Sequence, residues 1–299
     1  MMSLVNRSML LVLALALMWA AEEALLARVL GRQPVAQAVW LRFMFHVIAL
    51  FALWGWRDPA SLWRTRRPVS QLARSLCLVA MPVFWLLGLQ AGGDVPTMLS
   101  VFWLAPMLIL LFARWWLGER ASPGLWLATA IGSIGACVLL APATFPSLRL
   151  LVHPLGMAAA FSAYVVMTAS LRGESTRANL FYAGFGACLA LAPLMPWVWV
   201  TPALTDLLIL AAVALLGLGG LLALQRLVAC GPLLPSLPLL YLQLPFAVGM
   251  AWSAGSAPLW HTWLGSTLIC TAAAAAWALE VRRENRLRMN PRPGWELSR

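Results

Sequence analysis

The residues best suited to chemistry in this chain are ionisable side chains inside long apolar runs. Glu22 and Glu23 lie near the end of the first run, and Arg42 lies near the start of the second. At the rise of an α-helix, all three lie about 10–12 Å below the same membrane surface. Burying an ionisable group there costs about 2.5 kcal/mol or more, so it needs a partner or a function. We therefore predict an ion pair between Arg42 and one of the two glutamates.

Two roles are open for this ion pair. Its carboxylate could hold a proton or a cationic substrate, or the pair could be a structural clasp between adjacent helices. Glu22 and Glu23 point about 100° apart on a helix, so we expect only one of them to face a cavity. His46 lies one turn deeper than Arg42 on the same face. It is a candidate proton carrier, or a hydrogen-bonded interior histidine.

Aromatic and amide side chains inside the apolar runs are candidates for binding a substrate. Tyr164, Tyr241 and Gln243 could orient a ligand by hydrogen bonds, or they could bond neighbouring helices to each other. Deep tryptophans could stack on a planar or cationic substrate, or they could simply pack the core. These tryptophans are Trp19, Trp85 and Trp103.

Three further acids lie at the ends of apolar runs. Asp94 and Asp206 each precede or begin a run, where a carboxylate caps a helix N-terminus, so we expect capping roles. Glu119 precedes Ser122, which is followed by proline as in a helix start. We expect Glu119 to fix this loop by pairing with Arg114 or Arg120.

The composition excludes a soluble protein. The chain has 299 residues, of which 62% are hydrophobic and only 10% are charged, whereas a soluble domain has about 25% charged residues. A helix of about 20 apolar residues crosses the hydrocarbon core of a bilayer. We expect ten such spans, at 8–29, 35–56, 69–90, 95–117, 123–141, 154–172, 178–200, 204–229, 232–253 and 258–280.

All 21 basic residues are arginines. Without lysine the chain has no Walker A loop and no Schiff-base lysine, and we expect no cofactor. Most arginines fall in loops on the side of the N-terminus, whereas only Arg28, Arg32 and Arg149 fall on the other side. The positive-inside rule then predicts that both termini are cytoplasmic. The net charge of +11 follows from this pattern, so we do not expect nucleic acid as a partner.

Two segments of the chain resemble each other. Residues 116–133 read WLGERASPGLWLATAIGS and residues 252–266 read WSAGSAPLWHTWLGS. We interpret them as a duplication of two five-helix halves, 8–141 and 154–280. An odd number of spans per half makes the second half enter the membrane from the opposite side, so the repeats are inverted. Residues 281–299 are basic and contain proline, and we expect a disordered cytoplasmic tail.

Several short motifs, in their order and spacing, resemble the EamA-type members of the drug/metabolite transporter superfamily from about residue 8 to residue 283. The motifs are Trp19, Leu41-Arg42-Phe43, the basic loop from Arg64 to Arg74, Pro106, Leu117-Gly118-Glu119-Arg120, Tyr241-Leu242-Gln243-Leu244-Pro245-Phe246, and Pro258 to Gly265. The resemblance implies an all-α integral membrane protein of ten transmembrane helices in two inverted repeats, placed in the cytoplasmic membrane.

Within this superfamily, the two halves look most like the subgroup of riboflavin and S-adenosylmethionine carriers. Relatives also export amino acids and other metabolites, so the resemblance fixes neither the substrate nor the direction. Where the second copy often has Gly-Glu, this chain has Gly255-Ser256. Glu119 therefore has no symmetric counterpart.

We thus expect a secondary transporter, or permease, that moves a small metabolite or drug-like molecule by alternating access, as a monomer or homodimer in the lipid bilayer. Proton coupling and facilitated diffusion are both open, as are uptake and efflux. An intramembrane enzyme is an alternative, but beyond Glu22 and Glu23 the chain offers only His46 nearby. A non-transporting assembly factor or sensor is another, and it would have a fully ion-paired core without a cavity.

Overall fold

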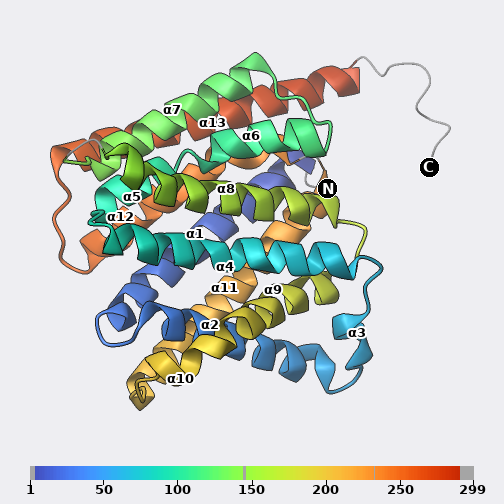
Figure 1. Cartoon of the computed structure of the whole chain (residues 1–299). Coiled ribbons are helices and arrows are strands. Elements are labelled where there is room, and N and C mark those ends of the chain that lie inside the picture. Colours follow the sequence, from blue (N-terminus) through green and yellow to red (C-terminus); the bar gives the residue numbers. More distant parts are fainter. Residues whose placement is uncertain (1–3, 144–145, 232, 290–299) are drawn as a thin grey trace.

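The computed structural model describes residues 4–143, 146–231 and 233–289, and its regular elements in these ranges are all helices (Figure 1). These elements, with η marking 3-10 or π segments, are α1 (Leu4–Leu30), α2 (Val35–Leu50), η1 (Phe51–Gly55), α3 (Ala60–Trp63), α4 (Pro68–Gln90), α5 (Val95–Phe102), α6 (Ala105–Trp116), α7 (Pro123–Leu140), α8 (Leu148–Ser170), α9 (Thr176–Leu191), η2 (Ala192–Leu194), α10 (Met195–Val198), α11 (Leu204–Cys230), η3 (Leu234–Leu242), α12 (Gln243–Ser253) and α13 (Trp260–Met289).

Ten segments of the described chain are long and apolar enough to cross a membrane, as the sequence predicts. A helix satisfies its own backbone hydrogen bonds, which is required in hydrocarbon, where water cannot supply partners. The segments are span 1 (Asn6–Leu30), span 2 (Val35–Gly55), span 3 (Pro68–Gln90), span 4 (Val95–Trp116), span 5 (Pro123–Leu140), span 6 (Leu148–Ser170), span 7 (Thr176–Val198), span 8 (Leu204–Cys230), span 9 (Leu234–Ser253) and span 10 (Trp260–Arg286).

The spans pack in pairs that join distant parts of the sequence. Span 1 packs along span 8, span 3 along span 6, and span 5 along span 10. Figure 1 shows the last pair, α7 and α13, side by side at the top of the bundle. The first turns of α4 and α9 and the last turn of α13 lie at the end of the bundle that carries α3 (Figure 1). We call this end the α3 side.

Spans 4 and 9 are both interrupted. α5 ends at Phe102 and α6 begins at Ala105, whereas span 9 is a 3-10 helix up to Leu242 and an α-helix beyond it. Pro106 and Pro245 lie four residues after Phe102 and Tyr241. Proline has no N–H and its ring clashes with the carbonyl four residues earlier, so each α-helix is broken there.

The last helix is longer than the sequence suggests. α13 continues to Met289, so residues 281–289 are helical and the expectation of a disordered tail is wrong for them. Arginines and acids along 280–286 favour helix by intrinsic propensity even without an apolar face. The remainder of the predicted tail, 290–299, lies outside the described residues.

Two glycines allow α7 and α13 to pack closely. A Cβ atom built on Gly265 would lie 2.5 Å from the backbone nitrogen of Leu139 and 2.6 Å from the carbonyl oxygen of Gly135. Backbone atoms cannot move aside as a flexible side chain can. Gly265 is therefore required for this helix pair.

We predict that Gly265→Ala destabilises the protein by about 1–3 kcal/mol, the usual result of overpacking. Gly249→Ala in α12 is the matched control, because no atom lies within 4 Å of the added Cβ and alanine favours a helix over glycine by about 0.5–1 kcal/mol. Thermal unfolding in detergent should show a lower Tm only for Gly265→Ala. An equal or higher Tm for Gly265→Ala would refute this account of the α7 and α13 contact.

Candidate functional site

The predicted ion pair between the first two spans is present, and its acid is Glu22. Nη2 of Arg42 on α2 lies 2.5 Å from Oε1 of Glu22 on α1. Glu22 is buried, with 6% of its surface exposed. The pair thus places one positive and one negative charge together inside the membrane-spanning region.

A third helix approaches this ion pair through a glycine. A Cβ atom on Gly217 of α11 would lie 2.7 Å from Nη2 of Arg42 and 3.1 Å from Oε2 of Glu22. Gly220, one turn further along α11, similarly leaves room for Nε1 of Trp19. The small residues of span 8 therefore let α11 pack directly on the charged part of α1 and α2.

Glu23 has a different environment from Glu22. The residue as a whole is exposed, whereas its carboxylate interacts with the side-chain amide of Gln243, the first residue of α12. Gln243 itself is buried, with 5% exposed. The structure thus brings four of the sequence candidates together at the break of span 9. They are Glu22, Glu23, Arg42 and Gln243.

His46 and Tyr164 are both interior residues with partners. Nε2 of His46 lies 3.1 Å from the carbonyl oxygen of Leu180 on α9, and the residue is buried. The ring of Tyr164 lies under the guanidinium of Arg74, at 5.5 Å. Of the two roles open for His46, proton carrier and hydrogen-bonded interior histidine, this hydrogen bond fits the second.

A row of aromatic rings connects the breaks of spans 4 and 9 with span 1. Trp103, next to the break of span 4, lies 5.6 Å from Tyr241 at the break of span 9, measured between ring centroids. Trp103 also contacts Phe102, which contacts Phe161, which in turn contacts Trp19, each at 5.6–5.7 Å. The hydroxyl of Tyr241 lies 2.7 Å from that of Ser133 on α7.

Trp85 does not belong to this row. It is partly buried against the main core cluster, and no ring contact in the described part of the chain involves it. Its position fits the core-packing alternative.

Sequence reasoning missed a buried polar cluster around Arg74, which we call the Arg74 cluster. The sequence places Arg74 in a basic loop, but it lies in the second turn of α4 with 0% of its surface exposed, so this expectation is wrong. Its Nη2 donates to Oε1 of Gln71 at 2.8 Å and to the carbonyl oxygen of Asn179 at 2.5 Å. Gln71, Arg74 and Ser75 share one face of a helix, and this spacing is the signal that could have revealed the cluster.

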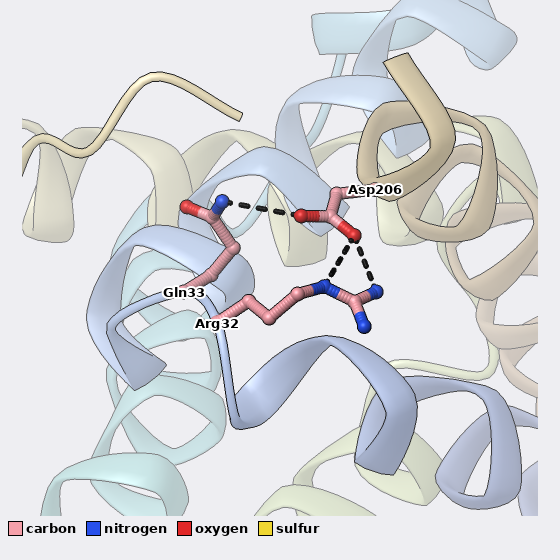
Figure 2. Close-up of polar contacts among 3 residues, drawn as sticks. All are labelled: Arg32, Gln33 and Asp206. Atoms are coloured by element: carbon pink, nitrogen blue, oxygen red, sulfur yellow. Dashed lines mark hydrogen bonds and ion pairs between the residues drawn. The ribbon is translucent and has the colours of Figure 1, made fainter. Parts of the chain in front are cut away.

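Opposite the α3 side, Asp206 joins span 8 to the turn between α1 and α2 (Figure 2). Its Oδ1 accepts from Nε and Nη2 of Arg32 at 3.0 and 2.5 Å, and its Oδ2 accepts from Gln33 at 3.3 Å. Asp206 lies in the first turn of α11 and makes no capping bond, so the expectation of a helix cap is wrong. Asp94 does cap α5, accepting from the backbone nitrogen of Thr97 at 2.9 Å.

On the α3 side, the loop from 58 to 67 is held by residues of the second half of the chain. The carboxylate of Glu174 accepts from the Thr65 hydroxyl at 2.8 Å and from the Arg66 backbone nitrogen at 3.0 Å. The hydroxyl of Tyr182 on α9 donates to the carbonyl oxygen of Trp63 at 3.1 Å. These contacts join the loop to the turn before α9 and to α9 itself.

Glu119 has no ion pair in the described chain, contrary to expectation, and its Oε2 has no hydrogen-bond partner. Since Gly118 adopts a positive φ of 69°, the loop turns by its own backbone. Glu119 lines a hollow of about 560 Å³ between the α6–α7 loop, η3 and α13.

Within the described residues, no group of three or more His, Cys, Asp or Glu side chains could hold a metal ion.

Comparison with known proteins places these features in context. The profile of the EamA-like transporter family matches residues 6–141. The chain is 31% identical over 242 residues, 75% of this chain and 74% of the relative, to the riboflavin transporter of Rhizobium johnstonii. It is 26% identical over 175 residues, 58% of this chain and 59% of the relative, to the S-adenosylmethionine uptake transporter of Rickettsia prowazekii. A crystal structure that is 20% identical matches the fold with a TM-score of 0.80, over 93% of this chain and 99% of the other.

We predict that Arg42→Gln destabilises the protein by about 3–5 kcal/mol, because it leaves the buried carboxylate of Glu22 without its cation. The double variant Glu22→Gln with Arg42→Gln should recover much of this loss, since neither charge then remains. Equilibrium unfolding in detergent of both single variants and the double variant measures the coupling. Strictly additive effects would mean that the two side chains do not interact.

A pH-dependent prediction concerns Glu174, which lies outside the spans. The backbone N–H of Arg66, and then the hydroxyl of Thr65, hold the pKa of its carboxyl below its usual value. A lowered pKa adds stability above the unfolded pKa, about 4.3, and that stability is lost as the pH falls through the folded pKa. Glu174→Gln should therefore lower the Tm at pH 7, and the difference from wild type should shrink below about pH 4.

Asp58→Asn is a control for this titration, because it removes an exposed acid of the same loop without touching Glu174. Its Tm difference from wild type should stay near zero at both pH values. A Glu174→Gln effect that is unchanged from pH 7 into the acidic range would contradict an ionic role for this carboxylate.

Proposed function

Because the chain belongs to the EamA-like transporter family, whose members carry small molecules across membranes, we propose that it is a secondary transporter working by alternating access in the cytoplasmic membrane. It is a multi-pass membrane protein and not an enzyme. The relatives named above are bacterial, which supports the cytoplasmic membrane. The arginine-rich loops on the α3 side support a cytoplasmic position for that side.

The observation that carries the proposal is that Glu23, an acid inside span 1, is an exposed residue. Glu23 lies seven residues before the end of α1, which is about 10 Å along the helix. An ionised carboxylate facing hydrocarbon at such depth would cost about 2.5 kcal/mol or more. We therefore assign Glu23 to the wall of a water-accessible path, beside α12.

Charge balance gives Glu23 its proposed role. Glu22 already pairs with Arg42, and no arginine in the described residues forms an ion pair with Glu23. A proton or a cationic group of the substrate would neutralise Glu23 in turn. Membrane carriers use intramembrane acids in this way for proton relays. In this proposal Glu22 and Arg42 are the clasp that holds Glu23 in place.

The packing of the spans supports two inverted five-helix repeats, 8–141 and 154–280, as the moving units. If each span corresponds to the span five positions later, the pair of spans 1 and 8 corresponds to the pair of spans 6 and 3, and both pairs are packed. The interrupted spans 4 and 9 correspond to each other as well. Broken helices at matching positions of inverted repeats mark the substrate site of many transporters.

The residues at these breaks suggest the kind of substrate. Trp19, Trp103 and Tyr241 would offer aromatic faces once the halves move apart, and Gln243 would offer an amide beside Glu23. Riboflavin and S-adenosylmethionine, named for the two relatives, each combine a planar ring system with a polar chain. We propose a small metabolite of that type as the substrate.

The test is uptake into proteoliposomes of labelled riboflavin, S-adenosylmethionine, amino acids and quaternary cations, with and without an imposed pH gradient. We expect gradient-driven flux of one compound in wild type and at least a tenfold loss in Glu23→Gln. The loss follows because the amide cannot take up and release a proton.

Glu119→Gln is the matched control, since it makes the same change on the α3 side outside the spans. It should keep the wild-type flux. Wild-type flux that is the same with and without the pH gradient, and that is unchanged in Glu23→Gln, would contradict proton coupling through Glu23. Folded wild type that moves no compound of the panel would contradict the proposed substrate type.

A further inference from the structure

Arg74 is a buried cation without a matching acid. Three charged side chains of the described chain are buried, namely Glu22, Arg74 and Asp206. Glu22 pairs with Arg42 and Asp206 with Arg32. Arg74 forms no salt bridge within the described residues, although it lies six residues into span 3, about 9 Å from its start.

The partners of Arg74 are all neutral. Its hydrogen-bond acceptors are the side-chain oxygen of Gln71, the carbonyl oxygen of Asn179 and, at 3.3 Å, the hydroxyl of Thr168, and the ring of Tyr164 lies under its guanidinium. The remaining donor, Nε, is buried and has no hydrogen-bond partner in the structure. A guanidinium has five N–H donors and no acceptor, so Arg74 retains unused capacity to bind an anion.

A buried charge in a membrane span requires compensation. Removing a charge from water is costly unless an opposite charge or a full set of hydrogen bonds replaces the water, and intramembrane arginines mark ligand or ion pathways. The neutral oxygens around Arg74 supply only part of this compensation. A role confined to structure leaves both the net charge and the free Nε unexplained.

The Arg74 cluster also contains amide donors of the kind that bind a carboxylate. Nε2 of Gln71 donates to Oδ1 of Asn179 at 2.6 Å, and Nδ2 of Asn179 donates to Oε1 of Gln225 at 3.0 Å. All three side chains are buried. An arginine fork flanked by amide N–H groups matches the two oxygens of a carboxylate.

The cluster lies where the two halves of the chain meet. Gln71 and Arg74 come from span 3, whereas Thr168, Asn179 and Gln225 come from spans 6, 7 and 8. On the α3 side, the contacts of Glu174 and Tyr182 with the 58–67 loop also join the two halves. An opening of the α3 side would separate these spans and expose Arg74.

We propose that Arg74, with Gln71 and Asn179, binds the carboxylate of a zwitterionic or anionic substrate when the α3 side opens. The inference rests on the proposed transport function and specifies its substrate class. The site is separate from Glu23, which lies in span 1 beside α12 and carries the opposite charge. A substrate with both a cationic and an anionic group would meet a complementary partner at each site.

The test measures binding by purified full-length protein in lipid nanodiscs, using titration calorimetry, and so does not depend on flux. The probes are S-adenosylmethionine, which has a carboxylate, and decarboxylated S-adenosylmethionine, which differs only by lacking it. We expect wild type to bind the first at least tenfold more tightly. Arg74→Gln should abolish this preference, and Arg74→Lys should weaken it because the fork is lost.

Arg149→Gln is the matched control, because Arg149 is an exposed arginine in the first turn of α8, at the opposite end of that helix from Thr168. It should keep the full preference. Wild type that binds the two probes equally, or fails to bind S-adenosylmethionine, would overturn the proposal, and so would a preference that survives in Arg74→Gln.

The wild-type comparison decides even when Arg74→Gln does not fold. Binding that depends on the carboxylate, without any flux, would contradict the transport proposal and support the carboxylate site at Arg74. Flux of a compound without a carboxylate, by a protein that binds both probes equally, would support transport and contradict the carboxylate site.

Discussion

Hydrocarbon offers no hydrogen-bond partners, and the structure depends on this constraint throughout. Backbone groups satisfy it by forming helices in all ten spans. Two pairs of charged side chains satisfy it: Glu22 binds Arg42 inside spans 1 and 2, and Asp206 binds Arg32 where span 8 begins. The first pair joins two consecutive helices, and the second joins α11 to the turn between α1 and α2.

Small residues and prolines adapt the helices to these pairs. Gly217 allows α11 to reach the ion pair without a side chain between them. Spans 4 and 9 are interrupted near Pro106 and Pro245, and such backbone at membrane depth is tolerated where it is buried in protein. Trp103 and Tyr241 contact each other at these breaks. The ion pairs thus involve spans 1, 2 and 8, whereas the interrupted helices are spans 4 and 9.

Two charged residues inside the spans have no ion-pair partner in the described chain. Glu23 is an acid with no arginine partner in the described chain, and Arg74 is an arginine with no acid partner there. Glu23 lies in span 1 and Arg74 in span 3. Contacts at both ends, around Asp206 and around Glu174, are formed in this structure. In the transport cycle proposed above, a substrate that supplies the missing charges would change which of these contacts is favourable.

The sequence alone determined the helical membrane fold, the ten spans and the need for a pair around Arg42. Each follows from local quantities: the length of an apolar run, the rise of a helix and the cost of a buried charge. Only the tertiary structure decided that Glu22 rather than Glu23 is the partner, because helical spacing gives a direction but not the neighbour that lies there. It likewise decided that Arg74 is buried and that Asp206 binds Arg32, since those contacts join residues 94 to 174 positions apart. Such contacts depend on how whole helices pack, which no short segment of sequence encodes.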